Sequence, residues 1–87
     1  LGFRRVLFRS ADYAAKGSVL AVSDAGCAAL FCKAALQAAG LNVAINTKLM
    51  TDRTHAAGLD EKAARMLAEY VPLADEVYQS VASRLRV

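Results

Sequence analysis

The architecture that we expect follows from residues Ser23 to Asn46, SDAGCAALFCKAALQAAGLNVAIN. This stretch contains no proline and is rich in alanine, the strongest helix former, so it predicts one long helix. Ser23 and Asp24 are residue types favoured at helix N-caps, because their side-chain oxygens accept hydrogen bonds from the free backbone N–H groups of the first turn. Asn42 and Asn46 mark the expected end of the helix.

This expected helix has two faces against which another helix could pack. Steps of four and three residues define an apolar seam that we predict to pack against a neighbour: Cys27, Phe31, Ala34, Ala38, Leu41 and Ile45. A second stripe is small in the middle and polar at both ends: Asp24, Ala28, Cys32, Ala35, Ala39, Asn42 and Asn46. Small residues allow close approach of a second helix. Two such faces need more neighbouring helices than 87 residues supply, so we expect an all-α fold of long antiparallel helices that is a fragment of a larger helical bundle.

The charge of the chain lies mostly at its start. The formal net charge is +3, yet without Arg4, Arg5 and Arg9 the chain carries eight basic and eight acidic residues. No basic stripe remains to hold phosphates, so nucleic acid is not an expected partner.

Residues 1–10, LGFRRVLFRS, read as a non-native N-terminal segment. Their LFRS ending resembles the translated end of a common sequencing adapter, and we exclude the segment from fold reasoning. The alternative is an amphipathic N-terminal arm or a targeting segment. On the first interpretation the natural domain occupies residues 11–87 and begins within a longer protein.

The segments before the long helix are short. Residues 11–16 are compatible with the end of a helix, and Gly17 is placed to terminate it. Residues 18–22 are expected to form a loop. That loop has neither the Walker spacing nor the glycine pattern of a dinucleotide site.

A second helical arm is expected after a connection at residues 47–50. Thr51 and Asp52 supply its N-cap, and Pro72 is expected to kink it without dividing it. The arm has one apolar seam: Leu59, Ala63, Met66, Tyr70, Leu73 and Val77.

The stretch from Ala25 to Ile45 is apolar on average, but Lys33, Gln37 and Asn42 interrupt it, so no membrane span is predicted. Two cysteines five residues apart match neither a metal site nor disulfide geometry within one helix. They suit a reducing cytoplasm.

Asn42 and Asn46 are the most specific polar pair, because residues four apart on a helix point the same way. Two amides on a small stripe can recognise a planar ligand edge, or they can simply bond to the last carbonyls of their helix. Asp24 has capping as its ordinary role, and about 27 Å of helix separates it from Asn42. His55 lacks a positioned partner for metal binding or acid/base catalysis.

Three segments together resemble one known family: KGSVLAVSDAG at residues 16–26, LNVAINTK at 41–48 and LADEVYQSV at 73–81. They are similar to the C-terminal half of the cyclodeaminase/cyclohydrolase family, whose members include formiminotetrahydrofolate cyclodeaminases and methenyltetrahydrofolate cyclohydrolases. Many members have an asparagine-rich loop before the SD pair, whereas this chain has Ser18, Leu20 and Ala21 there. The sequence KGSVLAVSD before and at this pair is more similar to the cyclohydrolase-like branch.

The resemblance implies an all-α domain about twice this length, a homodimer, and a tetrahydrofolate derivative as substrate. It implies no metal and no cofactor. Asp24, Asn42 and Asn46 become the expected substrate-binding or interface residues, and the main acid/base residue is expected outside this chain. Hydrolysis of 5,10-methenyltetrahydrofolate is the favoured reaction, with cyclodeamination as the alternative. The chain by itself is expected to be inactive. A non-enzymatic helical module that binds a partner helix is the other hypothesis.

Overall fold

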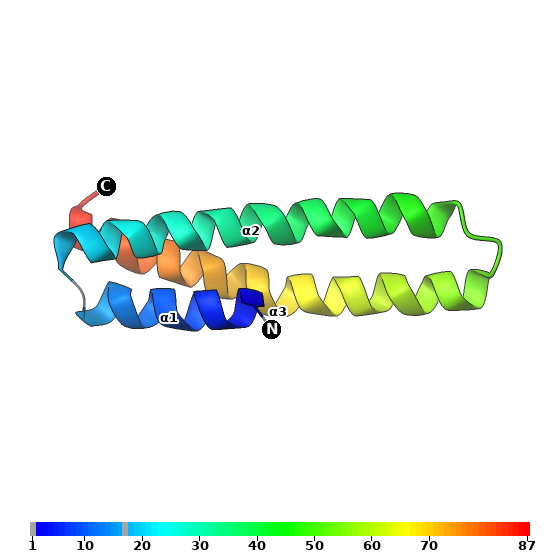
Figure 1. The fold of residues 1–87 in the computed structure, drawn as a ribbon, viewed down its shortest axis with the longest axis horizontal. Coiled ribbons are helices and arrows are strands. Elements are labelled where there is room, and N and C mark those ends of the chain that lie inside the picture. The colour runs from blue at the N-terminus through cyan, green and yellow to red at the C-terminus, as the bar shows by residue number, and fades with distance from the viewer. Residues whose placement is uncertain (1, 17) are drawn as a thin grey trace.

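The structure, a computed structural model, describes residues 2–16 and 18–87, with the side chains of residues 3 and 13–16 excepted. The described chain forms helices α1 (Gly2–Lys16), α2 (Val19–Lys48) and α3 (Arg53–Leu85). They pack as a rod with extents of 51 × 20 × 15 Å. Helices α2 and α3 form a long antiparallel hairpin, and α1 lies beside the first half of α2 (Figure 1). The expected all-α class with long antiparallel helices is confirmed.

Helix α2 begins earlier than the sequence predicted. Its N-cap is Ser18, in an extended conformation, and the Ser18 hydroxyl accepts a hydrogen bond from the Ala21 backbone N–H at 3.4 Å. The prediction of a loop at 18–22 and a cap at Ser23 and Asp24 was therefore wrong. Ser18 is itself a favoured cap, and the extra turn buries Val22 beside Val81 of α3.

The face of α2 that packs within the chain is not the predicted apolar seam. Its buried residues lie on the opposite side of the helix: Val22, Ala25, Gly26, Ala29, Cys32, Leu36 and Thr47. The predicted seam is exposed, with Phe31 at 75%, Leu41 at 74% and Ile45 at 58% exposure. Of the second stripe, only Cys32 is buried. Helix α2 is thus half covered, and its second apolar face has no neighbour among the described residues.

Helix α3 begins and packs much as predicted. Asp52 is the N-cap, and its carboxylate accepts a hydrogen bond from the His55 backbone N–H at 3.0 Å. In the predicted seam Tyr70 and Val77 are buried. Ala63, Met66 and Leu73 are half-buried, and Leu59 is exposed. The helix continues through Pro72 without dividing. A kink there stays a prediction.

Loss of the Asp52 cap should weaken the hairpin measurably. We expect Asp52→Ala to lower the free energy of unfolding by about 1 kcal/mol, because one backbone donor of the first turn loses its acceptor. Urea unfolding followed by circular dichroism measures this. Asp52→Asn is the matched control and should retain most of the stability, since asparagine also caps. Equal losses in the two variants would contradict the capping role.

Helix α1 includes the segment that we excluded from fold reasoning. Leu7 is 1% exposed and Ser10 is 3% exposed, so residues 2–10 contribute to the core. Leu7 and Ser10 lie one turn apart on the face of α1 toward the hairpin, so this segment packs with the rest of the chain. The adapter origin of the segment stays a prediction. Gly17, the expected terminator of this helix, lies outside the described residues.

The core is a strip along the rod. Its larger cluster joins all three helices: Leu7, Ala29, Cys32, Leu36, Tyr70, Ala74 and Val77. A smaller cluster joins Val22, Ala25 and Val81 near the C-terminal end of α3, with Leu85 packed against it. An ion pair between Lys33 Nζ and Asp75 Oδ1, at 2.7 Å, links α2 to α3 at the surface. Since both side chains remain partly exposed, it adds little stability.

Helix α2 is long and apolar enough to cross a membrane by length and composition, with a mean hydropathy of 1.7 over its most apolar window. A third of that window is buried inside the chain. Core helices of soluble proteins have the same properties. The expectation that the chain does not span a membrane stays a prediction.

Candidate functional site

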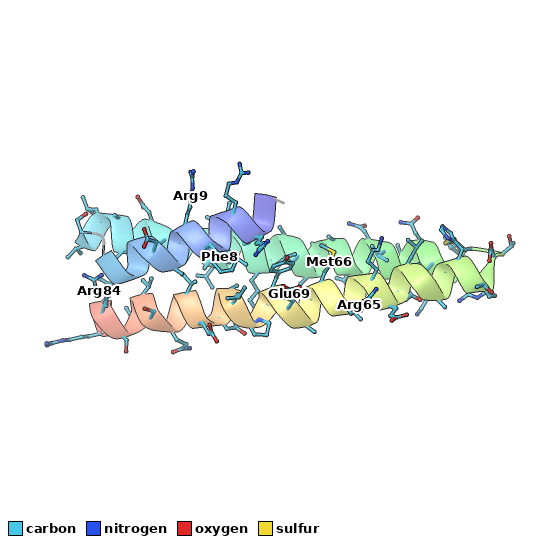
Figure 2. The ribbon with its side chains drawn as sticks, turned by 90° about the horizontal axis from the view of Figure 1, so that it is seen from below. Phe8, Arg9, Arg65, Met66, Glu69 and Arg84 are labelled. Carbon is cyan, nitrogen blue, oxygen red and sulfur yellow. The ribbon has the colours of Figure 1, made fainter. Side chains whose placement is uncertain are left out.

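Asp24 borders a cavity between α1 and α2. The cavity measures about 410 Å³. Its walls are mainly apolar, from Val6, Ala21, Ala25 and Ala28, and its polar residues are Arg9, Ser10 and Asp24. Asp24 lies in the second turn of α2 and is exposed, so it does not cap the helix. Figure 2 shows Arg9 on the side of α1 that faces away from α3. The cavity can therefore offer a carboxylate and a guanidinium to a ligand resting on small apolar side chains.

Asn42 and Asn46 lie near the other end of α2, and both are exposed. The Asn46 side-chain amide donates a hydrogen bond to the Asn42 backbone carbonyl at 2.7 Å. A hydrogen bond from the side chain to a carbonyl of the same helix is the alternative to ligand recognition that we considered from the sequence. The Asn46 carbonyl oxygen and the Asn42 amide remain on the exposed surface, so the pair still presents polar groups to a neighbour.

The structure does not bring Asp24 together with the two asparagines. All three lie on one continuous helix, and eighteen residues separate Asp24 from Asn42, which corresponds to about 27 Å. One small ligand cannot contact both ends of this helix within a single chain. Their assignment as substrate-binding residues stays a prediction.

A polar cluster at the turn between α2 and α3 was missed by the sequence analysis. The Thr47 hydroxyl, 2% exposed, donates to the Asp60 carboxylate at 2.6 Å and lies 3.1 Å from the Ala44 carbonyl oxygen. The Arg53 guanidinium donates to the carbonyls of Thr47 and Met50, at 2.7 and 3.1 Å. These bonds hold the hairpin turn beside Asn46. A spacing of thirteen residues across a turn carries no periodic signal, so only the fold reveals this cluster.

A second cavity of about 510 Å³ lies along the first turns of α3. Its walls are formed by Asp52, Thr54, His55, Gly58, Leu59 and Lys62. His55 was not predicted from the sequence to belong to a site. Four of the wall residues are polar or charged, but all come from a single helix, so the cavity is a surface hollow.

The other reactive groups are unremarkable in their surroundings. Burial raises the pKa of the Cys32 thiol, which keeps it protonated and weakly nucleophilic. Cys27 is exposed on the apolar seam. Over residues 2–16 and 18–87, no three His, Cys, Asp or Glu side chains are grouped as metal ligands.

Known proteins resemble this chain over most of its length. The formiminotransferase-cyclodeaminase family model matches residues 4–65, a range that includes Asp24, Asn42 and Asn46. A protein of Methylorubrum extorquens named methenyltetrahydrofolate cyclohydrolase is 35% identical over 82 residues, covering 94% of this chain and 39% of that protein. The chain thus spans about two-fifths of the length of the relative. No solved structure matches it.

The family match extends over α1, α2 and the first part of α3, and the relative aligns with almost all of the chain. Together with the all-α hairpin, they lead to one conclusion: this chain belongs to the formiminotransferase-cyclodeaminase family.

Proposed function

We propose that this chain is part of a longer folate one-carbon enzyme that hydrolyses the methenyl bridge of 5,10-methenyltetrahydrofolate. The observation that carries the proposal is the 35% identity, over 94% of the chain, to a protein named for that reaction. The relative is more than twice as long. We expect the active enzyme to include further helices beyond α1–α3, as the resemblance to the family implies. The 87-residue chain by itself is expected to show no turnover.

The reaction requires few groups. Water attacks the methenyl carbon while a base accepts one proton from it, which gives a neutral carbinolamine. The bond from that carbon to N5 then breaks as N5 receives a proton and the carbinol hydroxyl loses its own, which leaves a formyl group on N10 and releases one proton overall. A positioned acid/base residue does this proton transfer without a metal or a redox cofactor. We place that residue in the remainder of the enzyme, while Asp24, Asn42 and Asn46 contribute to substrate binding. Carboxylate and amide groups suit the hydrogen-bonding edge of a pterin ring.

The full-length gene product that contains this chain tests the assignment. In Asn42→Ala and Asn46→Ala, KM for methenyltetrahydrofolate should rise about 5- to 10-fold each, since one hydrogen bond contributes about 1 kcal/mol. Loss of the methenyl absorbance gives the rate. Gln37→Ala is the matched control, an exposed amide on another side of α2 that should leave KM unchanged. Unchanged kinetics in both asparagine variants would remove them from the site.

The alternative reaction is cyclodeamination, which the name of the family favours. It closes the ring of formiminotetrahydrofolate and releases ammonia. Offering both folates to the same enzyme separates the two: ammonia release with the formimino substrate, and no hydrolysis of the methenyl one, would overturn the cyclohydrolase assignment. A homodimeric state and a cytoplasmic location belong to the same proposal, and the two free cysteines support the location.

A further inference from the structure

The last turn of α2 contains a threonine whose burial its neighbours do not share. Thr47 is 2% exposed, whereas Asn46 and Lys48 on either side of it are exposed. Asparagine and threonine are poor helix formers, and the carbonyls of a last turn have no partners within their own helix. Helix ends of this kind fray. The turn therefore needs support from another part of the chain to stay helical.

Helix α3 supplies this support at two points, and both are on Thr47. The turn lies at the end of the rod away from α1 (Figure 1). The Thr47 hydroxyl bonds to Asp60 Oδ1 at 2.6 Å, a distance typical of a hydroxyl on a carboxylate, which is one of the stronger hydrogen bonds in proteins. The Arg53 guanidinium donates to the Thr47 carbonyl at 2.7 Å. Because Arg53 and Asp60 lie seven residues apart on one face of α3, a single rigid element fixes both the side chain and the main chain of Thr47.

The position of Asn46 depends on this turn remaining helical. Its side-chain amide donates to the Asn42 carbonyl at 2.7 Å, and its own carbonyl accepts from the Leu49 backbone N–H at 3.1 Å. The two asparagines share one face only while residues 42–46 follow the helix. Because a side-chain amide donates only through its nitrogen, the bond to Asn42 also leaves Asn46 Oδ1 as the group presented outward. Unwinding of the turn at Thr47 would remove this arrangement.

We propose that Thr47, Asp60 and Arg53 are positioning residues of the substrate site, which hold the last turn of α2 so that the two asparagines present their amides together. Thr47 is buried and its hydroxyl is bonded to α3, so it acts through Asn46 and does not touch the substrate. This inference rests on the proposed function in taking Asn42 and Asn46 as substrate-binding residues. The support that α3 gives to the turn does not depend on any folate.

Two variants of Thr47 separate the effect of its hydroxyl from that of its shape. Thr47→Val keeps the branched side chain and removes the bond to Asp60, whereas Thr47→Ser keeps the hydroxyl and loses a methyl group. In the 87-residue chain, amide hydrogen exchange at residues 46–50 should be about 5-fold or more faster in Thr47→Val, because one hydrogen bond fewer opposes local opening. Thr47→Ser should exchange at nearly the wild-type rate. Equal rates in the wild type and Thr47→Val, or equally fast exchange in both variants, would overturn the proposal.

A cycle of single and double variants in the full-length gene product tests the role in substrate binding. Thr47→Val should raise KM for methenyltetrahydrofolate about 3- to 5-fold with kcat nearly unchanged, since the acid/base residue lies elsewhere. In an Asn46→Ala background the same change should add almost nothing, because a positioning residue acts only through the residue that it positions. Val77→Ala, in the core and away from the turn, is the stability control and should leave KM unchanged.

The outcomes distinguish this inference from the proposed function. If Asn46→Ala raises KM but Thr47→Val does not, or if the two effects multiply independently, the positioning role is wrong and the proposed function stands. If the enzyme acts on formiminotetrahydrofolate instead, the proposed function is wrong, and the same cycle with that substrate decides the positioning role. An unchanged KM in Asn46→Ala with the substrate that the enzyme uses would overturn the positioning role together with the site assignment.

Discussion

Replacing Leu36 by alanine is expected to lower the free energy of unfolding by about 2–5 kcal/mol, a large fraction of what a domain of this size possesses. Leu36 is 4% exposed and belongs to the cluster that joins α1, α2 and α3. Truncation removes apolar contacts and enlarges a cavity of about 100 Å³ that already borders its side chain. Urea unfolding followed by circular dichroism measures the loss.

Leu20→Ala is the control for this experiment. Leu20 lies in the first turn of α2 with 80% exposure, outside the core. Its truncation should change stability by less than about 0.5 kcal/mol. Both variants must be compared at one protein concentration, because self-association adds to apparent stability. Similar losses for Leu20 and Leu36 would mean that the core lies elsewhere.

The second large effect is expected at Gly26, where the backbone of α2 lies directly against Val81 of α3. A Cβ atom at Gly26 would lie 2.9 Å from Val81 Cγ1 and 3.3 Å from Val81 Cβ. Val81 is buried and β-branched, so its side chain has no other rotamer available at low cost. We therefore expect Gly26→Leu to destabilise the chain by about 2–3 kcal/mol through overpacking, despite the better helix propensity of leucine. Thermal unfolding at fixed concentration gives the shift.

Two further variants identify the cause. Gly58→Leu places the same side chain on α3, where a Cβ atom meets nothing within 4 Å, and should stabilise the helix by up to about 1 kcal/mol. Val81→Ala combined with Gly26→Leu should recover part of the loss, because it removes the atoms that collide. If the double variant is as unstable as the sum of the two single variants, the clash with Val81 is not the cause.

A helix could be predicted correctly where a clear cap residue is followed by residues with a single apolar face. Asp52 is a strong cap followed by an amphipathic arm, and the structure begins α3 directly after it. The start of α2 was missed because Ser18 and Ser23 are both acceptable caps. Burial of Val22 against α3 selects Ser18, and that contact joins residues nearly sixty positions apart.

The candidate site was predictable only in its residue types. Asp24, Asn42 and Asn46 were singled out by spacing and resemblance, and the structure adds that Asp24 borders a cavity while the asparagines stand on an exposed surface. The Thr47 and Asp60 pair was invisible beforehand, because a hydrogen bond across a turn leaves no periodic pattern.

The helical character of the chain, the start of α3 and the family could all be inferred from the order of the residues, because these depend on local propensity and on short motifs. The buried face of α2 could not be inferred in this way. Apolar residues surround that helix, so its periodicity favours no single side. Only the positions of α1 and α3 show that Leu36 lies inside while Phe31 and Leu41 lie outside.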